Sequence, residues 1–333
     1  PGDRDDFKIA IICALPLEAN IVSALFDRKW DGRWYGKAAG DSNVYLFGLI
    51  GHHNVVLAHM PNMGKVAAAS AAVGLRASFQ KINLALVVGI CGGASLGEHH
   101  TEIFLGDVVV SEGIIQYDFG RQFPNNRFVR KHSPQDNLPR PNPEIRATIA
   151  KLRADHWLQG KVSGHLHDLQ QKFSAEVTYP GPSEDILFNP TYQHKHQSSE
   201  CTICFGSNGR GDVCDTALGL SCEQLECDQQ GVVFRRRSTQ PLAASAEWKP
   251  AVHFGLFASG DTVMKSGKDR DDIAARDGVI AFEMEGAGVL ENLPGTLVIK
   301  GICDYADSHK SKKWQPYAAA TATAVTKAFL EEW

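Results

Sequence analysis

Acidic residues in the C-terminal third of the chain stand where carboxylates could do chemistry. Glu283 and Glu285 follow the apolar segment 280–282, and Asp304 follows the apolar segment 296–302. A carboxylate buried at the end of a strand is costly without partners, so each one marks either a functional site or a helix cap. Such a group can accept two hydrogen bonds from a diol such as a ribose, or act as a general acid.

A glycine-rich segment, residues 89–93, follows the apolar run 84–88. Glycines leave no side chain in the way, so backbone amides there could approach a ligand closely. A tight turn between a strand and a helix explains the pattern equally well. The segment lacks the GxGxxG spacing, and Gly64-Lys65 lacks the other residues of a Walker motif. The sequence therefore disfavours Rossmann and P-loop cofactor sites.

The elements that would position these groups alternate between strands and helices. Apolar runs without alternation predict strands buried on both faces, at residues 7–13, 84–88, 107–115, 252–259, 280–282 and 296–302. Residues 44–49 and 54–59 predict a strand pair, and helical spacing is found at 17–25, 64–79 and 317–332. These patterns predict an α/β fold class built on one buried sheet.

The middle of the chain interrupts this alternation. Residues 121–143 are rich in Pro, Asn, Arg and Gln, residues 144–172 have helical spacing, and residues 176–250 are mostly polar. We therefore predict one domain over residues 7–332 that contains an irregular insertion at 121–250. The run Arg235-Arg236-Arg237 is expected to be a solvated surface segment, not a nucleic-acid site.

Composition excludes several classes of function. The 333 residues include 34 basic and 38 acidic ones, a net charge of −4, which argues against a protein that coats nucleic acid or an anionic membrane. No apolar run reaches the ~18 residues of a membrane helix, and the polar start lacks a signal peptide. We expect a cytoplasmic location. The first residue is Pro, so we also expect processing, or excision from a longer chain.

The eight cysteines fall into two groups. Cys13, Cys91 and Cys303 lie in apolar or glycine-rich segments and are expected to be buried, reduced thiols. The other five lie between residues 201 and 227, close to His194 and His196. The knuckle spacing of the first pair predicts a structural zinc site made by Cys201, Cys204, Cys214 and Cys222. A flexible insertion with reduced thiols is the alternative.

Taken together and in order, the motifs resemble the purine nucleoside phosphorylase/uridine phosphorylase superfamily, over residues 7–120 and 252–332. The motifs are residues 9–15 with Glu18, 63–69, 88–93, 105–111, 258–261, 282–287 and 302–307. Within the superfamily the chain most resembles the methylthioadenosine/adenosylhomocysteine nucleosidases. Residues 314–321 and the insertion resemble a fungal subgroup, in which the domain often precedes NACHT- or NB-ARC-type receptor regions.

The resemblance implies a three-layer α/β/α fold with a mixed, twisted central sheet. It also implies cleavage of the N-glycosidic bond of a purine nucleoside or nucleotide, with no catalytic cofactor. The partner would be a small molecule, and the assembly a homodimer or a higher homo-oligomer. Adenine, hypoxanthine and guanine remain open as bases.

The family's roles carry over residue by residue. Asp304 matches the general acid at purine N7, with Cys303 in place of the usual Ser. Glu285 matches the acceptor of the ribose hydroxyls, with Met284 beneath the sugar, and Glu18 matches the residue that orients water. The rest of the pocket is expected to contain Glu283, Ile90, Cys91, Gly92, Thr262, Val263 and Met264. Val263 replaces the usual Phe, so base stacking would fall to Tyr117 or Phe119.

Two questions about the reaction remain. Phosphorylases bind phosphate with an Arg after the first strand and a hydroxyl in the glycine segment. This chain has Glu18 and Ile90 there, and a carboxylate beside phosphate costs Coulomb energy. We therefore predict hydrolysis, with phosphorolysis or non-catalytic nucleotide sensing as alternatives. Basic residues at 121–131, 265–270 and 310–313 leave both nucleosides and nucleotides open as ligands.

Overall fold

The computed structural model describes residues 1–97, 101–125, 127–198, 200–205, 212–235 and 249–333. Its strands are β1 (Ile9–Cys13), β2 (Arg28–Trp30), β3 (Val44–Ile50), β4 (His53–His59), β5 (Leu84–Gly93), β6 (Val108–Gln116), β7 (Gly120–Phe123), β8 (Arg127–Arg130), β9 (Val252–Ser259), β10 (Val279–Glu283) and β11 (Thr296–Asp304). Its helices are α1 (Pro16–Ser23), α2 (Lys65–Ser78), α3 (Pro143–Ala154), α4 (Leu158–Phe173), α5 (Asp215–Gly219), α6 (Gly267–Asp277), α7 (Gly286–Asn292) and α8 (Gln315–Leu330).

In the described part of the chain, a mixed nine-stranded sheet has the order β10-β9-β6-β11-β5-β1-β4-β3-β2. The strands β1, β4, β5 and β11 run parallel, whereas β6 pairs with β11 in the antiparallel direction. β10 pairs with β9 and also with the end of β5, where Phe282 lies opposite Gly92. This extra pairing brings the glycine-rich end of β5 beside the acidic end of β10.

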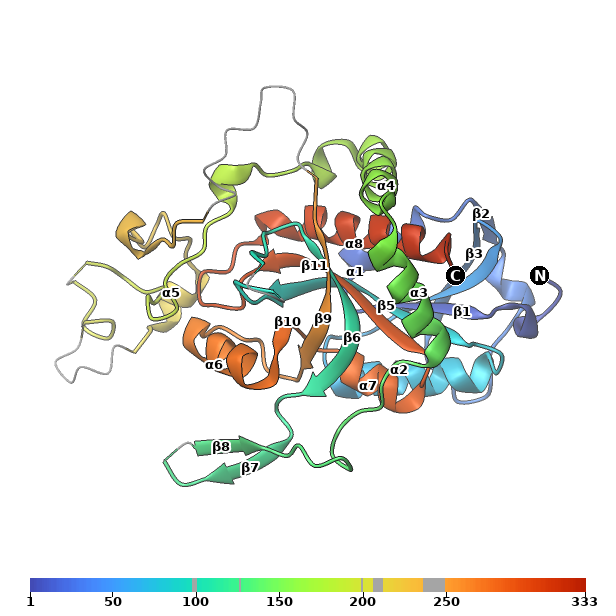
Figure 1. Cartoon of the computed structure of the whole chain (residues 1–333), viewed down its shortest axis with the longest axis horizontal. Coiled ribbons are helices and arrows are strands. Elements are labelled where there is room, and N and C mark those ends of the chain that lie inside the picture. Colours follow the sequence, from blue (N-terminus) through green and yellow to red (C-terminus); the bar gives the residue numbers. More distant parts are fainter. Residues whose placement is uncertain (98–100, 126, 199, 206–211, 236–248) are drawn as a thin grey trace.

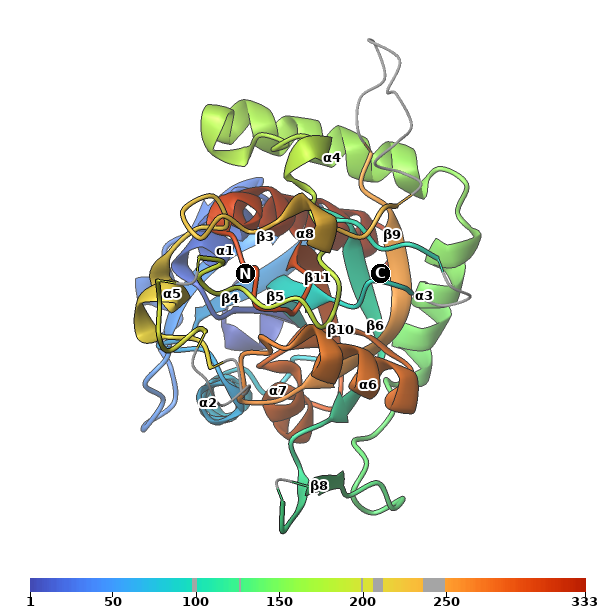
Figure 2. The same ribbon diagram turned by 90° about the vertical axis from the view of Figure 1, so that its left-hand side faces the viewer.

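Helices cover both faces of the sheet. α1, α4 and α8 lie on one side, and α2, α6 and α7 lie on the other (Figures 1 and 2). The structure therefore confirms the expected three-layer α/β/α fold with a mixed central sheet. Among the described residues, no helix combines the length and apolar character needed to cross a membrane.

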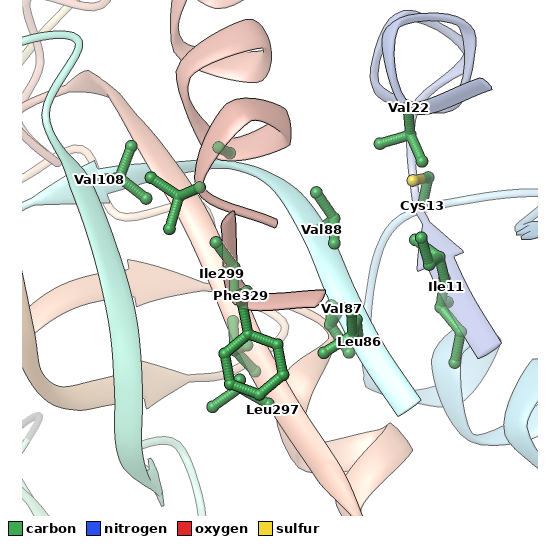
Figure 3. Packing of buried hydrophobic residues seen from close by; sticks show 14 of the residues in the cluster. Ile11, Cys13, Val22, Leu86, Val87, Val88, Val108, Leu297, Ile299 and Phe329 are labelled. Atoms are coloured by element: carbon green, nitrogen blue, oxygen red, sulfur yellow. The ribbon is translucent and has the colours of Figure 1, made fainter. Parts of the chain in front are cut away.

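The core between the sheet and α8 consists of aliphatic strand residues and a closely packed helix. Figure 3 shows Ile11, Val88, Ile299 and Phe329 in this layer, all of them buried. The threonines of α8 are buried, and their hydroxyls donate to carbonyl groups of the preceding turn. Gly301 allows the close approach, since a Cβ there would lie 1.9 Å from the Ala318 carbonyl oxygen.

The stretch 121–250 contains more regular structure than its composition suggests. β7 and β8 form an antiparallel hairpin that projects from the domain (Figure 1). The segment 144–172, for which one helical stretch was expected, forms two helices. α3 ends at Ala154, and α4 begins at Leu158 after a short turn. Val162, Leu166 and Leu169 of α4 belong to the main core. This part of the predicted insertion is therefore a component of the main domain.

Arg235, the first residue of the arginine run 235–237, is buried and is not part of a solvated surface. Arg235 is 6% exposed, and its guanidinium group pairs with Asp185 at 2.9 Å and donates to the Tyr305 hydroxyl. It also lies over the Phe104 ring. The expectation is wrong for Arg235, because a buried carboxylate and two aromatic rings from other segments meet it. Arg236 and Arg237 lie outside the described residues.

Candidate active site

A cavity of about 220 Å³ lies at the carboxyl ends of β1, β5, β10 and β11. The acidic motifs and the glycine-rich segment, which are far apart in the sequence, meet there. The predicted site residues on its wall are Glu18, Ile90, Cys91, Gly92, Tyr117, Thr262, Val263, Met264, Glu283, Met284, Glu285, Cys303 and Asp304. Phe119 is absent from this wall. Lining residues that sequence reasoning did not identify include Leu15, Met63 and Gln315. Lys310, one of the basic residues considered for a nucleotide, also lines the cavity.

Of the two aromatic residues expected to stack on a base, the structure brings only Tyr117 to the cavity. Its hydroxyl donates to the Thr262 carbonyl at 2.7 Å, and burial raises the pKa of Tyr117 to about 12. Tyr117 is therefore a neutral aromatic wall. Phe119 is exposed, and the Lys131 ammonium group lies 4.9 Å from its ring centre. The prediction for Phe119 is wrong, because the chain turns away from the cavity after Tyr117.

The glycine-rich segment is part of a strand, so the turn interpretation is wrong. β5 continues through Gly93 because β10 pairs with its end. The Ile90 amide donates to Glu18 Oε1 at 2.8 Å, so here the segment's backbone binds a side chain of the same protein. A Cβ on Gly89 would lie 1.9 Å from Glu18 Oε1. Gly89 is therefore the residue that makes room for Glu18.

Glu18 is fixed in place near the start of α1. Its Oε2 accepts hydrogen bonds from the Ala14 and Leu15 amides, both at 2.9 Å. Such free amides at a helix start favour a carboxylate. Glu18 is 1% exposed, and its burial raises the pKa of this carboxyl group, an effect that Lys300 opposes. Glu18 thus lies in the cavity wall as a carboxyl group whose pKa is raised above that of a free glutamate.

Lys300 is a functional candidate that sequence reasoning missed. It is 1% exposed, and its Nζ lies 3.0 Å from Glu285 Oε2 and 3.9 Å from Glu18 Oε1. Burial by itself would lower the pKa of Lys300, but the neighbouring carboxylates outweigh burial and raise it, so the side chain is charged. The available signal was a single Lys within the apolar segment 296–302, because a charge in a buried strand needs partners.

Glu283, the last residue of β10, and Glu285, which follows it, have different partners. Glu283 Oε2 accepts the amides of Glu285 and Gly286 at 2.8 and 2.7 Å, so Glu283 caps the start of α7. Burial, and then the charge of Glu285, raise the pKa of Glu283. Glu285 accepts the Gly64 amide at 3.3 Å and the Lys300 ammonium group at 3.0 Å. Glu285 is thus the ion-paired carboxylate of the two.

Asp304 ends β11 at the mouth of the cavity. Its Oδ1 accepts the Ala306 amide at 2.8 Å and the Lys310 ammonium group at 2.6 Å. The Cys303 thiol lies 3.5 Å from Oδ2, and a thiol is a weak donor. Oδ2 therefore has hydrogen-bonding capacity for a ligand.

The predicted zinc ligands do not form one group. Cys201, Cys204 and Cys214 gather with His196, whereas Cys222 lies with Cys227 and His194. The prediction that Cys222 binds the same zinc ion as Cys201, Cys204 and Cys214 is wrong. Cys222 lies beside His194 instead of His196.

Comparison with known proteins agrees with this architecture. Residues 8–168 match the model of the phosphorylase superfamily. A nucleotide-binding leucine-rich repeat (NLR)-like protein of Hyaloscypha variabilis is 32% identical over 98% of this chain, which spans 29% of that relative's length. The resemblance to the phosphorylase superfamily is thus confirmed over residues 8–168.

Solved structures with a similar fold include nucleosidases and a hydrolase. The 5′-methylthioadenosine/S-adenosylhomocysteine nucleosidase of Neisseria meningitidis has a TM-score of 0.56 at 15% identity, with 100% of each chain covered. The futalosine hydrolase of Helicobacter pylori has a TM-score of 0.56 at 15% identity, and the match covers 98% of this chain and 99% of the hydrolase. The S. pneumoniae nucleosidase has a TM-score of 0.53 at 18% identity, and the match covers 98% of this chain and 99% of the nucleosidase. These likenesses show a shared fold, the one expected from the motifs.

Proposed function

We propose that this domain hydrolyses the N-glycosidic bond of purine nucleosides and releases the free base and ribose. The observation that carries the proposal is the position of Glu18. Its buried carboxylate lies in the wall of the same cavity as Glu285 and Asp304, and three backbone amides hold it there. This arrangement offers a water-orienting group, a sugar-binding group and an acid to one ligand.

In the proposed reaction, each carboxyl group has one role. Asp304 acts as the general acid toward purine N7, so the base leaves as a neutral molecule when the bond between C1′ and N9 breaks. Glu285 accepts hydrogen bonds from the ribose 2′- and 3′-hydroxyls and holds the sugar in place. Glu18 orients a water molecule and takes one of its protons as the water oxygen bonds to C1′.

The charges around Glu18 favour water over phosphate as the nucleophile. A phosphate in the place of that water would lie beside a carboxylate that its amide donors hold in position. Lys300 is close, but it is already paired with Glu285 and faces Glu18. The site therefore supports hydrolysis better than phosphorolysis.

The cavity also favours a nucleoside over a nucleotide. Among the described residues that line it, Lys310 is the one cation, and it is paired with Asp304 at 2.6 Å. The other basic residues considered for phosphate lie elsewhere. Arg130 pairs with Asp277, and buried Arg270 binds Asp271 and the Tyr305 carbonyl. A polyphosphate such as that of ATP would find few free cations here.

Product analysis by liquid chromatography tests the proposal. The purified protein is incubated with adenosine, inosine, guanosine, methylthioadenosine and ATP, each with and without phosphate. We expect free base without phosphate, loss of this activity in Asp304→Asn, and retention in Asp272→Asn, a control on the exposed side of α6. Strict dependence on phosphate would establish a phosphorylase instead, and base release by Asp304→Asn at the normal rate would overturn the role of Asp304.

The NLR-like relative supports one alternative. Because this chain matches 29% of that relative's length, the domain could act as a ligand-binding module that senses a purine compound without cleaving it. Calorimetric binding of a purine compound without any base release would favour this sensor over the enzyme.

A further inference from the structure

Four potential metal ligands converge in the segment 188–235, outside the cavity. The Nδ1 atom of His196 lies 3.4 Å from Cys214 Sγ and 3.6 Å from Cys204 Sγ. With Cys201 Sγ, the four atoms all lie within 4.8 Å of one another. In a tetrahedral zinc site, a sulfur and a nitrogen ligand are about 3.6 Å apart, given the usual zinc–ligand distances. The group therefore has the composition and spacing of a closed Cys3His site.

A second group lies further along the same segment. His194 Nδ1 is 3.5 Å from Cys222 Sγ and 3.7 Å from Cys227 Sγ. The other ring nitrogen of His194, Nε2, donates to the Leu220 carbonyl at 2.9 Å, because a carbonyl can only accept. That bond leaves the Nδ1 lone pair directed toward the two sulfurs. A histidine that donates one ring N–H to a backbone carbonyl is characteristic of metal ligation.

The part of this segment that contains the two groups, residues 194–227, has a small apolar core. Its apolar cluster consists of Cys204, Cys214, Ala217 and Leu225, so the proposed ligands are themselves half of this small core. All eight cysteines are free, so no disulfide links the segment. Its one α-helix among the described residues is α5, with 5 residues. Segments with so small a core usually depend on metals or disulfides.

We propose that this segment binds two zinc ions, one at each group. The first ion has the ligands His196, Cys201, Cys204 and Cys214. The second has His194, Cys222 and Cys227, with solvent as the fourth ligand, since no further Cys, His, Asp or Glu among the described residues joins this group. Thiolate and imidazole ligands select zinc over magnesium or calcium. This inference is independent of the proposed hydrolysis.

Metal analysis of the purified protein tests the two sites separately. Inductively coupled plasma mass spectrometry is expected to find two zinc ions per chain in the wild type. We expect one in Cys214→Ala, one in Cys222→Ala and two in Cys13→Ala, a buried cysteine outside both groups. One zinc in the wild type, or an unchanged content in either cluster variant, would overturn the two-site assignment, and iron in place of zinc would overturn the choice of metal.

A second measurement on the wild type remains informative if a variant fails to fold. Alkylation of native protein, read by mass spectrometry, should spare the five cysteines at 201–227 until a chelator is added. Rapid alkylation without the chelator would contradict metal binding. So would a disulfide between Cys222 and Cys227 under non-reducing conditions. Cobalt substitution then separates the groups, because three thiolates give a stronger charge-transfer band than two.

Discussion

The buried ammonium group of Lys300 lies 3.0 Å from the Glu285 carboxylate. Because β11 carries Lys300 within the sheet and Asp304 at its end, one strand places both a cation and an acid beside the cavity. Glu18 faces the same cation from α1 at 3.9 Å. Lys300 is therefore a cation shared by two buried carboxylates, and its charge opposes the rise in the pKa of Glu18 that burial causes.

The first prediction concerns the pH dependence of the proposed hydrolysis. Burial raises the pKa of Glu18 and Lys300 lowers it, so replacing Lys300 with Met should raise the pKa of Glu18 further. Only the ionised form accepts a proton from water, so the activity falls as the pH drops through this pKa. We therefore expect the acid limb of kcat/KM to move to higher pH in Lys300→Met, so that activity on the acid side of the profile falls by about tenfold or more.

Steady-state assays with adenosine or inosine across pH 5–9, with about 7.5 as the reference pH, check this prediction. Lys300→Arg keeps the positive charge and should leave the acid limb near its wild-type position. Lys313→Met, which removes an exposed lysine, controls for loss of charge in general. An acid limb that stays in place in Lys300→Met would show that Lys300 does not act through Glu18.

The second prediction concerns Gly89. A methyl group at this position would come within 1.9 Å of Glu18 Oε1, so Gly89→Ala should displace the Glu18 side chain from its amide donors. We expect base release to fall about as far as in Glu18→Gln, with a stability loss of about 1–3 kcal/mol. Gly160→Ala on α4, where a methyl group meets nothing within 4 Å, should keep full activity. Normal turnover in Gly89→Ala would contradict the role of Glu18.

The third prediction links the second proposed zinc site to the cavity. The backbone amide of His194 donates to Ser308 Oγ at 3.1 Å, and the His194 ring lies 5.3 Å from His309. The next residue is Lys310, which contacts Asp304. Losing the ion at His194 should loosen this loop, so Cys222→Ala should reduce kcat by about tenfold or more, whereas Cys214→Ala should have a smaller effect.

Turnover and thermal unfolding of both cysteine variants are measured together. Similar melting temperatures with unequal turnover would support a specific effect on the loop. Equal losses of turnover in the two variants would indicate general destabilisation of the segment instead.

The fourth prediction concerns the stability of the join between the insertion and the core. Arg235 is buried against Asp185 and Tyr305, so Arg235→Met would leave Asp185 as an unpaired buried carboxylate. We expect a loss of about 3–5 kcal/mol in the free energy of unfolding, measured by urea denaturation. Lys313→Met breaks an exposed ion pair with Glu184 and should cost less than about 1 kcal/mol. Equal effects would contradict the burial of Arg235.

Local patterns in the sequence were sufficient for most of the fold. Continuous apolar runs predicted β1, β6, β9, β10 and β11, because a strand buried on both faces needs apolar residues throughout. The predicted end of β5 at residue 88 was too early. Glycines favour turns locally, but pairing of β10 with Gly92 and Gly93 extends the strand. Pairing partners remote in the chain override local preference.

In the candidate site, too, local sequence patterns predicted some features and contacts between remote segments decided the others. From apolar runs alone, the sequence predicted that Glu285 and Asp304 follow strand ends, and such ends of parallel strands share one edge of a sheet. The family resemblance added Glu18, and the structure places all three in the wall of one cavity. The tertiary structure alone decided which side chains contact one another. The pairing of Lys300 with Glu285, the choice of Tyr117 over Phe119 and the two separate cysteine groups all depend on distances between remote segments. Those distances follow from packing in three dimensions, which no spacing along the chain records.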